Sequence, residues 1–263
     1  MFKVFFATVL LAGSISLAGM APLAQRPTHQ SWVISKQKFE LAEAFKYKFK
    51  QRYDTALASA VAYDKVDLNQ IPEFQKNADE IQKIFEVIRN NRFLEDPEQA
   101  NFPRRISWLY PMDGCFARAE WVAHLLKKND PNLKFSRVFI FGDLEVKTKN
   151  SSSGSVSWWY HVAVIIRHQG KAFVIDPSLE VTGPLELADW VKLQVPNPSQ
   201  DAQLAICTGN SYEPNSNCDA DKKELLSEAE AAHEIAVYLF YERRNLEKLG
   251  RDSQAELGDN PPW

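Results

Sequence analysis

The sequence predicts an α+β fold, in which helices pack on an antiparallel sheet. The strongest strand candidate, 156–167 ("VSWWYHVAVIIR"), is followed by a tight turn at "HQG" and by a second strand at 171–176 ("KAFVID"). Two strands joined by so short a turn form an antiparallel hairpin. Helical patterns come before and after these strands rather than alternating with them. That order is typical of the α+β class.

The chain begins with a pattern typical of a secretory signal peptide. Lys3 precedes an apolar run, and small residues at Ala18, Ala21 and Ala24 offer cleavage positions. The alternative, a transmembrane anchor, needs about 20 strongly apolar residues, and Gly and Ser interrupt this run. We therefore expect residues 1–24 to be a signal peptide. The mature protein is then secreted or periplasmic and has no membrane partner.

Three helices are predicted before the sheet. Apolar side chains recur four positions apart over 36–62 among Lys, Glu and Arg, as they do along one face of a helix. A second stripe of this kind runs over 73–91. The third helix starts at or near Cys115, because "PMDG" ends any earlier helix and the following "CFARAEWVAHLL" has helical spacing.

The remaining elements complete the predicted order. Segment 134–141 ("KFSRVFIF") is rich in β-branched and aromatic residues and predicts a strand, and 148–155 ("TKNSSSGS") predicts a flexible loop. Gly and Pro open a helix over 183–193. A long helix is predicted over 222–250, with Gly250 as its terminator.

Composition bounds the class of protein. The 263 residues are 45% apolar, 25% charged and 12% aromatic, which is typical of a globular protein and allows one good-sized domain with an extension. A net charge of −3 argues against a partner that needs a broad basic surface, such as nucleic acid. The sequence contains no internal repeat.

Export affects how the three cysteines are interpreted, because thiols pair in oxidising compartments. Cys207 and Cys218 flank a polar, turn-rich loop ("CTGNSYEPNSNC") that a disulfide can close. If they pair, Cys115 is a free thiol in an exported protein, which indicates reactivity. The alternative is a buried, inert Cys115.

The position of Cys115 favours reactivity. The first backbone N–H groups of a helix have no intrahelical partner, and the positive end of the helix dipole favours a thiolate over a thiol. The same N–H groups, including that of Cys115, can stabilise an oxyanion. A nucleophilic thiolate also needs a base that a third group orients.

Among the five histidines, His161 is the candidate base. It lies inside the strong strand, and period-two alternation puts it on one face with Trp159, Ala163 and Ile165. An imidazole on an apolar face needs a polar partner. Asp176, at the end of the next strand, is the candidate for that partner.

Hairpin geometry brings this pair together. A hairpin that turns at Gln169 places residue 161 opposite about residue 177, so Asp176 is within reach of His161. The alternative interpretation is a satisfied His–Asp pair in a core, unrelated to the cysteine. No HxxxH, CxxC, GxSxG, phosphate-loop or dinucleotide motif accompanies these residues, so we expect no metal site.

Four motifs follow one another along the chain: "YPMDGCFARA" (110–119), "VFIFGDL" (138–144), "YHVAV" (160–164) and "IDPSL" (175–179). In order and approximate spacing they resemble the motifs of the bacterial protein-glutaminases. The resemblance extends from about Ile71 to Trp190. It implies a transglutaminase-like, papain-like core in which the helix that begins at the nucleophile packs on an antiparallel sheet. The helices predicted at both ends of the chain are additions to that core.

The resemblance also implies an activity. Cys115 matches the family's nucleophile, His161 its base and Asp176 its orienting acid. The family consists of secreted enzymes that convert glutamine side chains of proteins to glutamate and release ammonia. The resemblance implies no cofactor, and proteins or peptides with exposed glutamine as partners of a monomeric enzyme. Tyr110, Trp158 and Trp159 are candidates to line a slot for the glutamine side chain, or else to pack in the core.

The resemblance further suggests a division of the mature chain. Residues 25–70 are expected to form an N-terminal helical extension, a candidate pro-segment, and residues 71–263 the catalytic domain. A transglutaminase or a cysteine protease could use the same triad, because the acceptor depends on what the pocket admits. A non-enzymatic secreted binding protein on this scaffold is a further alternative.

Overall fold

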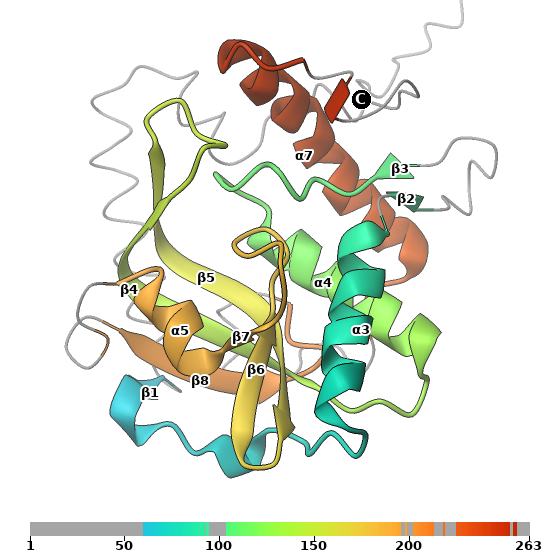
Figure 1. Cartoon of the computed structure of the whole chain (residues 1–263), viewed down its shortest axis with the longest axis vertical. Coiled ribbons are helices and arrows are strands. Elements are labelled where there is room, and N and C mark those ends of the chain that lie inside the picture. Colours follow the sequence, from blue (N-terminus) through green and yellow to red (C-terminus); the bar gives the residue numbers. More distant parts are fainter. Residues whose placement is uncertain are drawn as a thin grey trace, which may run out of the picture.

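The computed structural model describes residues 60–91, 93–94, 104–195, 198, 202–212, 218, 225–252 and 255–256. The predicted signal peptide (1–24) and the predicted helix over 36–62, up to residue 59, lie outside these ranges. Within them the chain folds as helices packed on an antiparallel sheet whose strands differ in length (Figure 1). The predicted α+β class is confirmed.

The centre of the structure is a six-stranded sheet with the order β1-β8-β4-β5-β6-β7, in which every neighbouring pair is antiparallel. A second sheet pairs β2 with β3. The strands are β1 (Val61–Ala62), β2 (Phe93–Leu94), β3 (Arg104–Arg105), β4 (Ser136–Lys147), β5 (Ser155–His168), β6 (Lys171–Ile175), β7 (Leu185–Glu186) and β8 (Gln203–Thr208).

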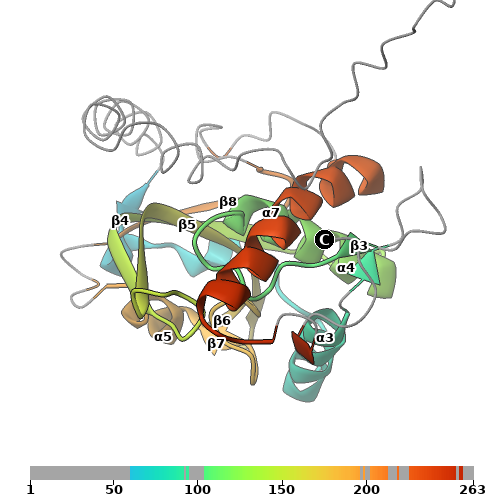
Figure 2. The same cartoon turned by 90° about the horizontal axis from the view of Figure 1, so that it is seen from above.

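Helices cover both faces of the large sheet. They are α3 (Ala78–Asn90), α4 (Cys115–Asn129), α5 (Leu187–Lys192) and α7 (Glu228–Lys248), with short 3-10 turns η3 (Tyr63–Lys65) and η4 (Leu68–Gln70) near the start. Helices α3, α4 and α7 gather on one side and α5 lies on the other (Figures 1 and 2). The central β5 contacts α4, and α4 in turn contacts α3 and α7.

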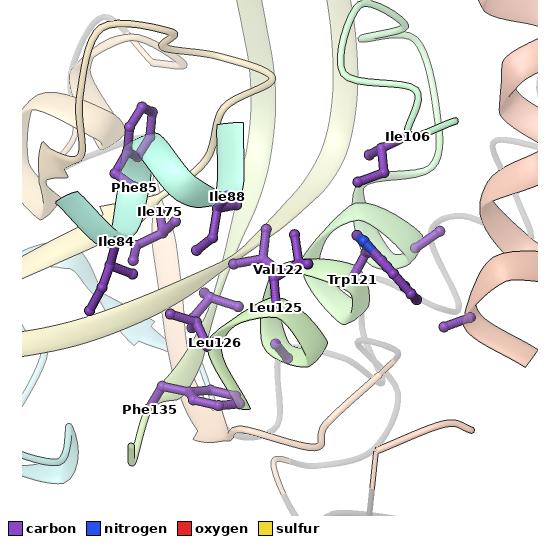
Figure 3. Close-up of a cluster of buried hydrophobic side chains, with 14 of the residues drawn as sticks. Ile84, Phe85, Ile88, Ile106, Trp121, Val122, Leu125, Leu126, Phe135 and Ile175 are labelled. Atoms are coloured by element: carbon purple, nitrogen blue, oxygen red, sulfur yellow. The ribbon is translucent and has the colours of Figure 1, made fainter. Parts of the chain in front are cut away.

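The alternation of side chains along β5 divides the core into two parts. Val164 and Ile166 point into the cluster formed with α3, α4 and α7, whereas Ala163 and Ile165 point into the cluster formed with α5. In the first cluster, apolar side chains of α3 face those of α4 (Figure 3), namely Ile84, Phe85, Ile88, Val122, Leu125 and Leu126. This packing fixes α4 against the sheet.

Local capping explains where the helices begin. The predicted helix over 73–91 starts later, at Ala78, because the Asn77 side chain accepts a hydrogen bond from the Glu80 N–H. The helix predicted over 222–250 begins at Glu228, where Ser227 and Glu230 form a capping box. The helix predicted over 183–193 begins only at Leu187, since Leu185 and Glu186 pair with β6 as β7.

The structure corrects three other expectations. Val61 and Ala62 form an edge strand on β8 rather than the end of a helix. Strand β8 was not predicted, although it lies inside the sheet between β1 and β4. The loop expected to be flexible is instead anchored, because Asn150 is buried and its carbonyl and side chain accept hydrogen bonds from Asn245 and Arg251.

Within the described part of the chain, every helix is too short or too polar to cross a membrane.

Candidate active site

Cys115 is the first residue of α4, as the sequence predicts. The residue before it, Gly114, is the N-cap and has a φ of +82°. Glycine adopts this left-handed conformation without steric cost. The turn therefore directs the chain abruptly into the helix, and Cys115 lies at the positive end of the helix dipole, only partly exposed to solvent.

The buried side chain of Arg118, one turn further along α4, fixes the loop before Cys115 by hydrogen bonds. Its Nη1 atom donates to the carbonyl oxygens of Tyr110 at 2.9 Å and Asp113 at 2.8 Å. Gly114 N donates to the Asp113 carboxylate at 2.7 Å. These bonds fix the backbone conformation that presents the Cys115 N–H.

Helix α7 packs over the same loop. A Cβ atom added to Gly114 would lie 2.8 Å from the ring of Tyr238, so the two segments are in close contact. Tyr110 stacks on Tyr238 and Tyr241, and the Leu109 N–H donates to the Glu242 carboxylate at 3.1 Å. The ring of Tyr110 is thus buried between the loop and α7.

His161 and Asp176 meet across the hairpin of β5 and β6. Gln169 and Gly170 form a two-residue turn with positive φ, and Val164 pairs with Ile175. Continued toward Asp176, this register places residue 161 opposite residue 178, one position from the expected 177, because two residues occupy the turn instead of one. The His161 Nε2 atom still lies 2.7 Å from Asp176 Oδ2, and both residues are buried.

The electrostatics of this pair favour a charged imidazolium and carboxylate. Burial alone would lower the pKa of His161, but the charge of Asp176 and its hydrogen bond, with a further contribution from the Cys115 side chain, raise it to about 9. Burial would raise the pKa of Asp176, but His161 and hydrogen bonds from Ser178 and Trp190 lower it to about 2. At neutral pH the two groups carry opposite charges.

The tryptophan on the His161 side of the strand is Trp158, not Trp159 as simple alternation predicts. The β4–β5 register shifts between Phe141 and Leu144, and Gly142 in the irregular segment has a φ of +148°. The Trp158 ring stacks on the His161 ring at 5.2 Å, and its Nε1 donates to the Met112 carbonyl at 3.3 Å. Trp159 packs with Phe141 and Tyr160 on the opposite side.

Cys115, His161 and Asp176 line one pocket between α4 and the sheet, together with Trp108, Arg118, Ala119, Val122, Val162, Ala163, Ile175, Pro177 and Ser178. Tyr110, Trp158 and Trp159, the sequence candidates for a substrate slot, do not line this pocket. Sequence reasoning missed Arg118, Ser178 and Trp190. Only Ser178 carried a signal, because a serine two residues after an aspartate can close a local turn on its carboxylate.

A buried ion pair supports α4 beyond the pocket. Glu120 of α4 pairs with Arg137 of β4, and both side chains are almost completely buried. Glu120 Oε1 also accepts from Leu226 N at 2.6 Å, while Arg137 Nε donates to the Gly209 carbonyl at 2.9 Å. The pair therefore connects the helix to the sheet and to two loops.

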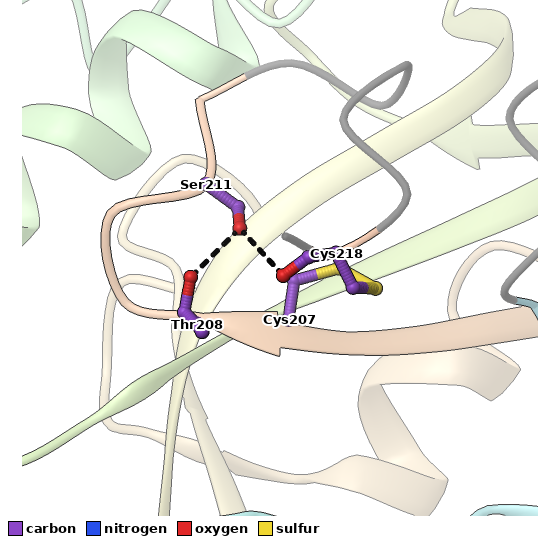
Figure 4. The surroundings of a disulfide bond; sticks show 4 residues. All are labelled: Cys207, Thr208, Ser211 and Cys218. Carbon is purple, nitrogen blue, oxygen red and sulfur yellow. Dashed lines mark hydrogen bonds between the residues drawn. A yellow bond between two sulfur atoms is a disulfide. The ribbon is translucent and has the colours of Figure 1, made fainter. Parts of the chain in front are cut away.

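One of those loops is closed by the disulfide bond between Cys207 and Cys218. Ser211 lies inside the loop, and its Oγ atom makes hydrogen bonds with the hydroxyl of Thr208 and the carbonyl of Cys218 (Figure 4). Cys115 is the free cysteine. Among the described residues, no three His, Cys, Asp or Glu side chains gather as a metal site would require.

Part of this chain is similar to known glutaminases. Residues 81–194 match a family model described as glutaminase. A crystal structure of protein-glutaminase is 28% identical, with a TM-score of 0.42 over 54% of this chain and 75% of that chain. The NMR structure of protein-glutaminase from Chryseobacterium proteolyticum is 27% identical, with a TM-score of 0.43 over 52% and 74%.

A crystal structure of pro-protein-glutaminase is 25% identical, with a TM-score of 0.46 over 66% of this chain and 62% of that chain. No curated protein matches the chain. The matched segment 81–194 contains Cys115, His161 and Asp176. Residues 81–194, somewhat less than half of this chain, are therefore similar to the glutaminase family.

Proposed function

We propose that this protein is a secreted protein-glutamine deamidase that uses Cys115, His161 and Asp176 as its catalytic triad. The observation that carries the proposal is the meeting of these three side chains in one pocket, inside the segment that matches the glutaminase family. Its substrates are then proteins or peptides with exposed glutamine, attacked at the side-chain carboxamide.

The geometry supports a thioester mechanism. Because Asp176 occupies His161 Nε2, Nδ1 is the ring nitrogen left to exchange a proton with the Cys115 thiol. The Cys115 thiolate attacks the carboxamide carbon, and the Cys115 N–H at the start of α4, with one upstream donor, holds the oxyanion. His161 gives its proton to the departing ammonia, so the C–N bond breaks as the thioester forms.

Water completes the cycle. His161, now neutral, takes a proton from a water molecule, which attacks the thioester carbonyl. The C–S bond breaks, the product leaves as glutamate, and the Cys115 thiolate and His161 imidazolium are restored. Asp176 stabilises the imidazolium and fixes the ring orientation throughout.

Ammonia release together with conversion of glutamine to glutamate separates this function from its rivals, because a transglutaminase also releases ammonia but leaves a crosslink. The mature protein should release ammonia from a glutamine-rich protein and raise its mass by about 1 Da per converted side chain, since an amide becomes an acid. Cys115→Ala should do neither. Peptide cleavage would instead indicate a protease, crosslinking a transglutaminase, and an inert wild type, also with residues 25–70 removed, a binding scaffold.

We further propose that residues 1–24 are removed on export, that 25–70 are an extension or pro-segment, and that 71–263 carry the activity. The Cys207–Cys218 disulfide supports an oxidising compartment. N-terminal sequencing of the exported protein tests this division. A mature chain that starts at residue 1 would contradict it.

A further inference from the structure

Asp176 is held by more partners than the proposed triad needs. Its Oδ2 atom accepts from His161 at 2.7 Å and also from the indole Nε1 of Trp190 at 3.0 Å. Its Oδ1 atom accepts from Ser178 Oγ at 2.6 Å and from the Ser178 N–H at 3.3 Å. Both carboxylate oxygens are therefore fixed from two directions.

The surroundings of Trp190 hold its indole N–H in a fixed position toward Asp176. Trp190 is fully buried on α5, and its ring centroid lies 5.6 Å from that of His161. Gln194 Nε2 donates to the Trp190 carbonyl at 3.0 Å, and α5 packs on β6 and β7. The indole N–H thus comes from a fixed position on the face of the sheet opposite α4.

We propose that Trp190, assisted by Ser178, is a positioning residue that keeps the Asp176 carboxylate ionised and turned toward His161. The expected change in kcat rests on the proposed function, whereas the expected change in the titration of Asp176 does not. Trp190 does not line the pocket that holds Cys115, whereas Ser178 does. Both side chains donate a hydrogen bond to the Asp176 carboxylate and act through it. The partner at Oδ2 is decisive, because that oxygen also receives the His161 bond.

The effect of the Trp190 indole on the Asp176 carboxylate depends on the other charged and titratable groups near it. His161 faces it from β5, and Cys115 and Arg118 line the same pocket from α4. Hydrogen bonds to a charged acceptor are stronger than those to a neutral one, and they favour the ionised form. Loss of the Trp190 donor should therefore make Asp176 easier to protonate and free its carboxylate to rotate.

The test compares Trp190→Phe with a matched control in the full-length protein. The substitution keeps an aromatic ring but removes the N–H. Trp121→Phe is the control, because Trp121 is also buried but its Nε1 has no hydrogen-bond partner among the described residues. Both variants lose similar packing, and only the first loses a bond to Asp176. Ser178→Ala removes the second side-chain donor.

Two readouts are needed. The first is the carboxyl carbon NMR titration of Asp176, which requires no enzymatic activity; its midpoint should rise by about one pH unit in Trp190→Phe and stay unchanged in Trp121→Phe. The second is steady-state deamidation, in which kcat should fall about tenfold in Trp190→Phe with KM nearly constant. Ser178→Ala should show the same directions.

An unchanged Asp176 titration in Trp190→Phe, or a shift equal to that of Trp121→Phe, would overturn the inference. The NMR result also separates the two proposals. If the wild type releases no ammonia yet the midpoint shifts as expected, the deamidase function fails while the positioning role of Trp190 stands.

Discussion

The His161 imidazole and the Asp176 carboxylate face each other across the β5–β6 hairpin, with 2.7 Å between Nε2 and Oδ2. Both side chains are buried. They carry opposite charges at neutral pH because each group stabilises the charge of the other. This relationship underlies both the chemistry we propose and the pH range in which the pair contributes most to the stability of the fold.

The pair should stabilise the fold most between about pH 4 and 6.5. Asp176 has a folded pKa of about 2 against an ordinary 3.8, so its contribution is full above about pH 4 and is lost as the pH falls through 2. His161 has a folded pKa of about 9 against 6.5, so its contribution is full below 6.5 and is lost as the pH rises through 9.

Urea unfolding of wild type and Asp176→Asn at several pH values measures this window. The difference in free energy of unfolding should be largest near pH 5.5 and shrink toward both ends of the range. A difference that does not vary with pH would show that the charges of the pair make no net contribution.

Gly114→Ala should destabilise the protein by more than the strain of a left-handed alanine. That strain alone is about 1–2 kcal/mol, and the added Cβ would also lie 2.8 Å from Tyr238. Gly170→Ala is the matched control, because Gly170 has a φ of +80° and open space at its Cβ position. Equal losses in thermal or urea unfolding would contradict the close packing of α7 on the Cys115 loop.

Glu120→Gln should cost about 3–5 kcal/mol, because it leaves the buried Arg137 guanidinium without its counter-ion. Glu247→Gln breaks the exposed ion pair with Arg243 and should cost less than about 1 kcal/mol. Urea unfolding of both variants gives the comparison. A loss for Glu120→Gln as small as that of the exposed pair would rule out the supporting role of this interaction.

The cysteines can be counted directly. Thiol titration of the native protein should find one reactive group, Cys115, and full reduction should expose all three cysteines. Replacing both Cys207 and Cys218 with serine should lower the free energy of unfolding by about 3 kcal/mol, since the bond restricts the unfolded chain. Three reactive thiols without reductant would contradict the disulfide.

Sequence reasoning located the elements of the site because local rules decide them. "PMDG" followed by helical spacing placed Cys115 at a helix start, and a short turn between two apolar strands put His161 near Asp176. The predicted register of the β5–β6 hairpin was wrong by one residue, yet His161 and Asp176 still form the expected hydrogen bond, because Asp176 lies at the end of its strand.

What sequence could not supply depends on contacts distant in the chain. The irregular β4–β5 pairing exchanged the sides of Trp158 and Trp159, and no alternation rule anticipates a bulge. The place of strand β8 in the sheet is determined by its pairing with β4 rather than by its own sequence pattern. The bond from Trp190 to Asp176 arises only when α5 folds back on the sheet.

The most direct test of the proposed mechanism is to trap the thioester on Cys115. Acid quench of the enzyme during turnover of a glutamine-containing peptide, followed by peptide mapping by mass spectrometry, should find the Cys115 peptide heavier by the substrate mass less one ammonia. Cys115→Ala should carry no adduct. Ammonia release without any Cys115 adduct, or with undiminished rate in Cys115→Ala, would contradict the account.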